Sequence, residues 1–318
     1  MQKNKYDKAA AAKARNEKVA ETLEMLKEGL QSIRSSAEYK NYLKVMSKFP
    51  SYSMKNTLLI FKQCPYASYV AGFRTWQKEF DRHVRKGEKG IRILAPRMVD
   101  KENEKDPSIN NEQIKDKSVK KSMIGFHTIY VFDISQTEGK PLPTPVQTEI
   151  LSDEVERFDL LFKKMCSLTP FKVVFEDLKS GTNGVTRYLT STIALQKDMP
   201  QLQTVKTLLH EITHSRLHNP DLCPDEELYR LSDQSIKETE AESTAYVVAS
   251  YFGLDTSGFS FPYLVLWSEQ EDELLENSLD RISKTSAALI EELEQKLKKI
   301  HHPILARQGL NQALNPVQ

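Results

Sequence analysis

The stretch "LLHEITHSRLH", from Leu208 to His218, contains the pattern H-E-x-x-H at His210, Glu211 and His214. On an α-helix, residues four positions apart lie on nearly one face, so the two imidazoles can converge on one metal ion. Glu211 lies one step further round the helix, where a carboxylate can act as a base beside the metal. The spacing therefore predicts a helix that carries two zinc ligands and a general base.

A third ligand must come from another element, because catalytic zinc normally takes three protein ligands and one water. His218 lies on the last turn of the same helix, and a straight helix cannot easily aim three successive turns at one point. The segment "KETEAESTAYVVASYFGL", residues 237–254, places Glu238 and Glu242 on one helical face. We assign Glu238 as the third ligand and Glu242 as the acceptor that orients a ligand histidine. Glu240 is expected to face solvent.

These residue types together favour peptide hydrolysis. A zinc ion lowers the pKa of a bound water, Glu211 can take the proton, and the polarised carbonyl of a peptide can then be attacked. The segment "TSTIAL", residues 190–195, is expected to form the sheet edge along which an extended peptide lies. Tyr188 and Tyr246 are the two residues considered for stabilising the oxyanion.

The overall composition excludes several other classes of protein. With 45 Lys and Arg against 44 Asp and Glu in 318 residues, the formal charge of +1 gives no global attraction to nucleic acid or membrane. The longest apolar runs fall short of the roughly 18 to 20 residues that a membrane span needs. The N-terminus is charged throughout, and Cys64, Cys166 and Cys223 are widely separated and odd in number. We therefore expect a cytoplasmic bacterial protein with reduced thiols and no membrane partner.

The chain is long enough for two domains, and an α+β fold is expected. Three prolines and a glycine in "QTEGKPLPTPVQTE", residues 136–149, interrupt all periodicity and mark the linker. The expected divisions are a first domain at 1–140 with a loop at 100–121, a linker at 141–150, a second domain at 151–300 and a tail at 301–318. Helices are expected at 7–34, 36–49, 51–63, 152–166, 203–219, 233–252 and 270–300. Strands are expected at 91–96, 123–135, 171–177 and 190–195, with strand-like composition also at 68–77. The strand at 123–135 can pair with 91–95, and residues 180–186 are expected to form a turn.

A basic turn between Arg82 and Arg92 has five Lys or Arg against one Glu, with aromatic residues just upstream. Positive charge attracts phosphates and aromatic faces stack on unpaired bases, so the mixture favours single-stranded nucleic acid over duplex. The alternative interpretation is a solvated loop beside aromatic core residues.

The residues of the metal motif also resemble a known family. "LLHEITHSRLH" followed by "KETEAESTAYVVASYFGLDTS" closely resembles the gluzincin-like metallopeptidase domain of ArdC-type antirestriction proteins, which is similar in turn to ImmA/IrrE peptidases. The resemblance covers roughly 150–300. It implies a zincin-like fold, zinc bound by His210, His214 and Glu238, and catalysis by Glu211.

The N-terminal segment resembles the same family. Residues 52–96, "YSMKNTLLIFKQCPYASYVAGFRTWQKEFDRHVRKGEKGIRILAP", and residues 130–139, "YVFDISQTEG", are similar to the single-stranded-DNA-binding domain of ArdC-type proteins, over roughly 35–140. The expected DNA contacts are Lys55, Asn56, Arg74, Trp76, Arg85, Lys86, Lys89 and Arg92.

The resemblance implies an antirestriction protein of a conjugative element, which binds incoming single-stranded DNA and carries a zinc metallopeptidase-like domain. Two alternatives stay open. One is an ImmA/IrrE-like cytoplasmic protease that cleaves a regulator. The other is a non-catalytic DNA-binding module in which zinc is structural.

Overall fold

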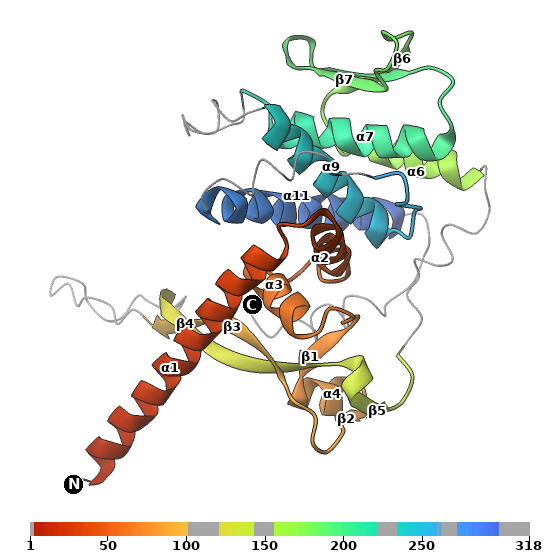
Figure 1. Ribbon diagram of the computed structural model, residues 1–318. Helices are drawn as coiled ribbons and strands as arrows, with labels where there is room; N and C mark the ends of the chain where they lie inside the picture. Colours follow the sequence, from red (N-terminus) through yellow and green to blue (C-terminus); the bar gives the residue numbers. More distant parts are fainter. Residues whose placement is uncertain are drawn as a thin grey trace, which may run out of the picture.

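The computed structural model describes residues 3–100, 121–142, 156–221, 234–259, 261 and 272–298. The interior of the loop expected at 100–121, most of the expected linker, Cys223 and the expected tail at 301–318 lie outside these residues. The fold is a mixed α/β arrangement, in which long helices lie between two small sheets (Figure 1).

Three helices open the chain, as the sequence predicts. They are α1 (Lys3–Ser32), α2 (Ser36–Lys48) and α3 (Met54–Gln63). Serine side chains start two of them: Ser35 accepts from the backbone N–H of Glu38 before α2, and Ser53 accepts from that of Asn56 before α3.

An antiparallel sheet follows the three helices. It contains β1 (Val70–Gly72), β3 (Ile91–Asp100) and β4 (Lys121–Asp133) in the order β1-β4-β3. The predicted pairing of the last two strands is confirmed, with Ile91 opposite Val131. A second pair joins β2 (Arg82–Val84) to β5 (Thr137–Gly139), and the 3-10 turn η1 (Ile134–Gln136) precedes β5.

The strand-like composition at 68–77 is misleading, because only β1 is extended and α4 (Phe73–Glu79) follows it at once. Trp76 is fully buried and donates its indole N–H to the carbonyl of Phe132 at 2.8 Å. Phe80, four residues later, packs against the same indole with ring centroids 5.2 Å apart. Helical spacing puts both rings on one face. The segment is therefore helical because its aromatic side chains pack together, although its residue types favour a strand.

The outer edge of β3 is closed by two amide side chains from α3. Asn56 exchanges two hydrogen bonds of 2.9 Å with the backbone N–H and C=O of Leu94. Gln63 does the same with Arg92, again at 2.9 Å. The two amides lie seven residues apart on α3 and supply the bonds of a missing neighbouring strand.

Replacing Asn56 with Ala is expected to lower the free energy of unfolding by about 2 to 4 kcal/mol, because two buried backbone groups of Leu94 lose their partners. Chemical denaturation of the full chain measures this change. Lys55→Ala is the control: its exposed ion pair with Glu276 should contribute less than about 1 kcal/mol. Equal effects of the two substitutions would contradict the edge-closing role of Asn56.

The second half of the chain contains α6 (Glu156–Cys166), a three-stranded sheet and three further described helices. The strands are β6 (Lys172–Glu176), β7 (Gly184–Arg187) and β8 (Thr192–Gln196), with the 3-10 turn η2 (Tyr188–Thr190) between the last two. The helices are α7 (Gln201–Leu217), α9 (Gln234–Tyr251) and α11 (Asp272–Lys298).

The order of this sheet is β6-β8-β7, with β8 parallel to β6 and antiparallel to β7. The expectation that residues 190–195 form a sheet edge is therefore wrong, because β8 is central. The edge beside α7 is β7, in a segment that the sequence predicts to be a turn.

The two halves of the chain pack together through α2 and α9 (Figure 1). The buried hydroxyl groups of Tyr39 and Ser243 lie 2.9 Å apart, and the rings of Tyr39 and Phe261 contact each other edge to face. One hydrophobic cluster contains side chains from both halves. The division into two domains stays a prediction. In the part of the chain that the structure describes, no helix is both long enough and apolar enough to cross a membrane.

Candidate metal centre

Helix α7 presents the histidines of the H-E-x-x-H motif on one face and apolar residues on another. Leu208 and Ile212 are fully buried in the core, while His210 and His214 face α9. On α9, the buried side chains of Ala241 and Ala245 are small, so the two helices can approach closely.

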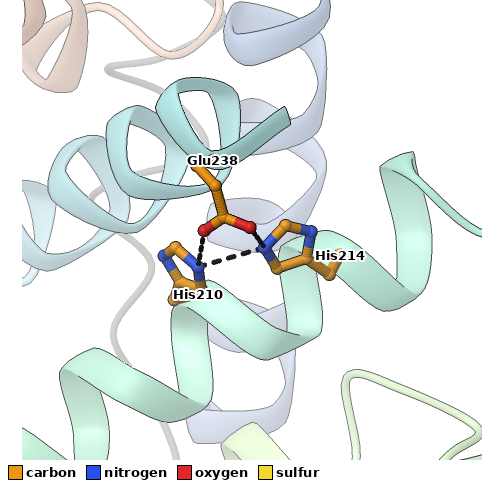
Figure 2. Close-up of side chains that lie close together, drawn as sticks. All are labelled: His210, His214 and Glu238. Atoms are coloured by element: carbon orange, nitrogen blue, oxygen red, sulfur yellow. Dashed lines mark hydrogen bonds and ion pairs between the residues drawn. The ribbon is translucent and has the colours of Figure 1, made fainter. Parts of the chain in front are cut away.

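Glu238 reaches from α9 to a point between the two histidines (Figure 2). The Nε2 atoms of His210 and His214 lie 3.0 Å apart. The Glu238 carboxylate oxygens lie 3.2 Å from Nε2 of His210 and 3.5 Å from that of His214. Two ligand atoms about 2.1 Å from one tetrahedral zinc ion are about 3.4 Å apart. This donor set therefore fits one divalent cation with little movement.

The other ring nitrogen of His210 faces a second carboxylate. Oε2 of Glu242 lies 3.3 Å from Nδ1 of His210, and Oε1 of Glu242 lies 3.2 Å from the ammonium group of Lys206. A carboxylate on Nδ1 fixes the orientation of the ring and leaves Nε2 for a metal. Glu242 thus lies where the sequence places the orienting acceptor.

The charges of the centre favour a cation between these groups. Burial lowers the pKa of His210, but hydrogen bonds with Glu238 and Glu242 outweigh it and raise that pKa to about 9. Burial raises the pKa of Glu238, but its contacts with His210 and His214 hold it well below its usual range. Burial lowers the pKa of His214, and Glu238 offsets this only in part. Without a metal, one proton on His210 therefore supplies the positive charge.

Glu211 is buried beside the histidines and is held by β7. Its Oε2 accepts a hydrogen bond of 2.7 Å from the hydroxyl of Thr186. Burial raises the pKa of Glu211, and the charge of His210 opposes this shift. Gly184 allows the strand to approach this closely, because an added Cβ would lie 2.8 Å from Oε1 of Glu211. Thr186 and Gly184 belong to the strand that the sequence interpretation missed.

His218 and Glu240 lie inside the protein, which corrects the expectation that Glu240 faces solvent. The Glu240 side chain is fully buried, with Oε2 at 3.2 Å from Nε2 of His218 and Oε1 at 2.6 Å from Arg281 on α11. Burial raises the pKa of Glu240, but His218 and Arg281 bring it below its usual value. His218 and, from far along the sequence, Arg281 both stabilise a charge at this depth.

A pocket of about 630 Å³ opens onto the centre. It is lined by β7, the residues before it, α7 and α9, and it includes Glu211 and Tyr188. The hydroxyl of Tyr188 lies 3.4 Å from the carbonyl of His214. Tyr246 instead packs in the core against Phe259 and Phe261, so it is withdrawn as an oxyanion donor.

The expected DNA contacts separate into three groups. Asn56 and Trp76 are buried and structural, which leaves neither side chain a face for a nucleotide, so we withdraw them as DNA contacts. The second group is paired with acidic side chains: Lys55 with Glu276, Arg85 with Glu88, and Arg92 with Glu21. Arg74, Lys86 and Lys89 are exposed, and their contact with DNA stays a prediction.

Two aromatic side chains are exposed in the same region: Phe73, one of the aromatic residues just upstream of the basic turn, and Tyr130, which the sequence interpretation missed. Tyr130 on β4 is 44% exposed and Phe73 is 53% exposed. An added Cβ at Gly90 would lie 3.0 Å from Tyr130 and 3.1 Å from Phe132, so the basic turn lies directly against these rings. Phe73 in turn contacts Phe132, with ring centroids 6.2 Å apart. Strand alternation in residues 123–135 is the signal that could have identified Tyr130.

Residues 10–132 match the family described as the N-terminal domain of anti-restriction factor ArdC. This part of the chain is an ArdC-type N-terminal domain. A Mn(II)-bound crystal structure of the antirestriction ArdC protein from the R388 plasmid matches 87% of this chain and 99% of its own length, with a TM-score of 0.51 and 16% identity. At this identity the likeness shows the fold alone. A metal-free crystal structure of that protein has a TM-score of 0.47, with 18% identity, 77% of this chain covered and 86% of that one.

The chain is also 25% identical over 288 residues to the uncharacterized protein pXO2-81 of Bacillus anthracis. The match covers 80% of this chain and 47% of the relative. The chain therefore spans about half the length of this curated relative.

Proposed function

We propose that this ArdC-type protein is an antirestriction protein that combines a zinc-dependent peptidase centre with a surface for single-stranded DNA. The observation that carries the peptidase part is the convergence of His210, His214 and Glu238 beside the buried carboxylate of Glu211, in an open pocket. In this proposal the second half of the chain, at 151–300, is a zincin-like domain and the segment 1–140 binds DNA.

Three protein ligands and an adjoining pocket favour a catalytic metal over a structural one. Structural zinc sites normally have four protein ligands and are closed, whereas catalytic sites keep one position for water or substrate. Two observations support the catalytic alternative: a base with a raised pKa beside the ligands, and a pocket of about 630 Å³ in front of them.

Each residue of the centre has a defined role in the proposed hydrolysis. A bound zinc ion would supply a Lewis acid and an activated water. Glu211, held through its Oε2 by Thr186, accepts the proton of the attacking water and passes it to the leaving amine. Burial, which raises the pKa of Glu211, favours its holding the proton until the leaving amine takes it. Loss of hydrolysis in Glu211→Gln, with metal binding retained, is the test of this part.

The substrate peptide is proposed to bind along β7. Among the described strands, β7 pairs with β8 alone, and its residues Gly184, Val185 and Thr186 line the pocket. An extended peptide can add to such an edge as a further strand through backbone hydrogen bonds. Because the hydroxyl of Thr186 on β7 contacts Glu211, a peptide paired with β7 has its scissile bond close to this base.

Single-stranded DNA is proposed to bind the aromatic and basic side chains around the turn Lys86–Gly90. The exposed rings of Tyr130 and Phe73 lie beside this turn, and Arg74, Lys86 and Lys89 supply positive charge. Rings of this kind stack on unpaired bases while cations contact phosphates. The surface therefore replaces the earlier expectation of stacking on Trp76.

Replacing Tyr130 with Leu is expected to weaken binding of a single-stranded oligonucleotide about tenfold, because one base loses its stacking partner. Fluorescence anisotropy with the full chain measures the affinity, and a duplex of the same sequence should bind more weakly. Phe175→Leu is the control, since Phe175 is 47% exposed on β6 in the other half of the chain. Equal affinities of the two variants, or no binding of the wild type at low salt, would argue for a peptidase without this DNA surface.

A further inference from the structure

A buried row of side chains runs from the candidate ligand His214 to α11. Nδ1 of His214 lies 2.7 Å from Nδ1 of His218, and Nε2 of His218 lies 3.2 Å from Oε2 of Glu240. Arg281 donates to Oε1 of Glu240 from two nitrogens, at 2.6 and 3.1 Å. His218 and Glu240 are almost completely buried, so their polar atoms need one another as partners.

The donor and the acceptor of each hydrogen bond in this row can be assigned by starting from Arg281. The guanidinium of Arg281 only donates, and the carboxylate of Glu240 only accepts, so Nε2 of His218 carries a hydrogen. In a neutral imidazole the other nitrogen is then an acceptor, so Nδ1 of His218 accepts from the N–H at Nδ1 of His214. Nε2 of His214 is left with a free lone pair, and this is the atom that lies with His210 and Glu238.

We propose that His218, Glu240 and Arg281 are positioning residues, which fix His214 in the tautomer that can bind a metal. His210 reaches the same state through direct contact with Glu242, whereas His214 depends on a row that includes a third helix, α11. The inference rests on the proposed metal centre. It assigns to α11, which supplies none of the three candidate ligands, a part in metal affinity.

Glu240→Gln is the substitution that tests this row most sharply. Arg281 attracts the oxygen of the introduced amide, which turns the NH₂ group toward Nε2 of His218. Nε2 of His218 must then accept a hydrogen bond, so the hydrogen of His218 moves to Nδ1. Nδ1 of His214 accepts from it, and the hydrogen of His214 moves to Nε2, where it blocks the lone pair that would bind the metal. Affinity of the purified full chain for Zn²⁺, measured by competition with a chromophoric chelator, should fall about 10- to 100-fold.

A second substitution separates positioning from simple loss of packing. In Glu240→Gln with Arg281→Met, the guanidinium no longer attracts the amide oxygen away from His218, so the oxygen can accept as the carboxylate does. Zn²⁺ affinity should recover to within about tenfold of the wild type. A purely structural role would make the double variant bind worse than Glu240→Gln alone, and that result would overturn the proposal.

Glu292→Gln is the matched control, because Glu292 also joins α11 to α7 through an arginine. Its oxygens lie 2.6 and 2.7 Å from the guanidinium of Arg216, and no candidate ligand takes part in this contact. This variant should keep its Zn²⁺ affinity within about twofold of the wild type. It should lose only a little thermal stability, because a partly exposed ion pair contributes little to folding. An equal loss of Zn²⁺ affinity in Glu292→Gln and Glu240→Gln would overturn the proposal.

Nitrogen NMR of the histidine rings in the metal-free wild-type chain tests the same inference without a substitution. The proposal predicts hydrogen on Nδ1 of His214 and on Nε2 of His218. Hydrogen on Nε2 of His214 instead would overturn it. A wild-type chain with these tautomers and no affinity for Zn²⁺ would overturn the proposed function and leave the positioning row intact, so the two failures are distinguishable.

Discussion

Replacing Glu211 with Gln is expected to lower peptide hydrolysis at least 100-fold, because the amide cannot accept the proton of the attacking water. The Oε2 position next to Thr186 and the shape of the buried side chain are kept, so the fold and the three ligands should stay in place. Mass spectrometry of a mixed peptide library after incubation with the Zn²⁺-loaded chain measures the hydrolysis.

Metal content must be measured on the same samples. Glu211→Gln should retain Zn²⁺ at one ion per chain, whereas a structural metal site predicts no change in any activity when Glu211 is replaced. Glu292→Gln, on α11, serves again as the control and should hydrolyse peptides as the wild type does. Hydrolysis that survives in Glu211→Gln would contradict its assignment as the base.

Affinity for Zn²⁺ is expected to rise steeply with pH. Without metal, His210 is protonated below a pKa of about 9, and this proton occupies the space between the ligands. A metal must displace it, so the apparent affinity should increase about tenfold per pH unit below pH 9. Between pH 6 and pH 8 the expected gain is about 100-fold, with one proton released per ion.

Isothermal titration in two buffers with different ionisation enthalpies measures both the affinity and the released proton. The sign follows from the raised pKa: protonated His210 is the competing state, and it is lost as pH rises. The variant His210→Ala should bind Zn²⁺ weakly and lose this dependence. An affinity that does not change between pH 6 and pH 8 would contradict the electrostatics of the centre.

The side chains of the candidate metal centre could be predicted from the sequence because each pair of them lies on one face of a single helix. His210 and His214 share one helical face, and Glu238 and Glu242 share another, so two periodicities suffice to place four side chains. Glu240 could not be placed in the same way. Its burial depends on Arg281, 41 residues later on a different helix, and no local pattern links the two.

The fold was predictable where helices have clear periodicity and where strands alternate. It was not predictable at β7, because "SGTNGVT" has two glycines and several polar residues, as turns do. Gly184 is there for close approach to Glu211, a requirement set by tertiary structure. The roles of Trp76 and Asn56 were also not predictable, because they too depend on tertiary structure. Both belong to a segment rich in basic and aromatic residues, and the structure uses them for packing and for the edge of β3.

We propose that His210, His214 and Glu238 bind one zinc ion beside Glu211. A crystal of the full chain soaked in Zn²⁺, with an anomalous difference map at the zinc absorption edge, can locate this ion. We expect a single strong peak about 2.0 to 2.2 Å from Nε2 of both histidines and from a Glu238 oxygen. A fully soaked crystal with no peak at these residues, or with a peak held by other side chains, would contradict it.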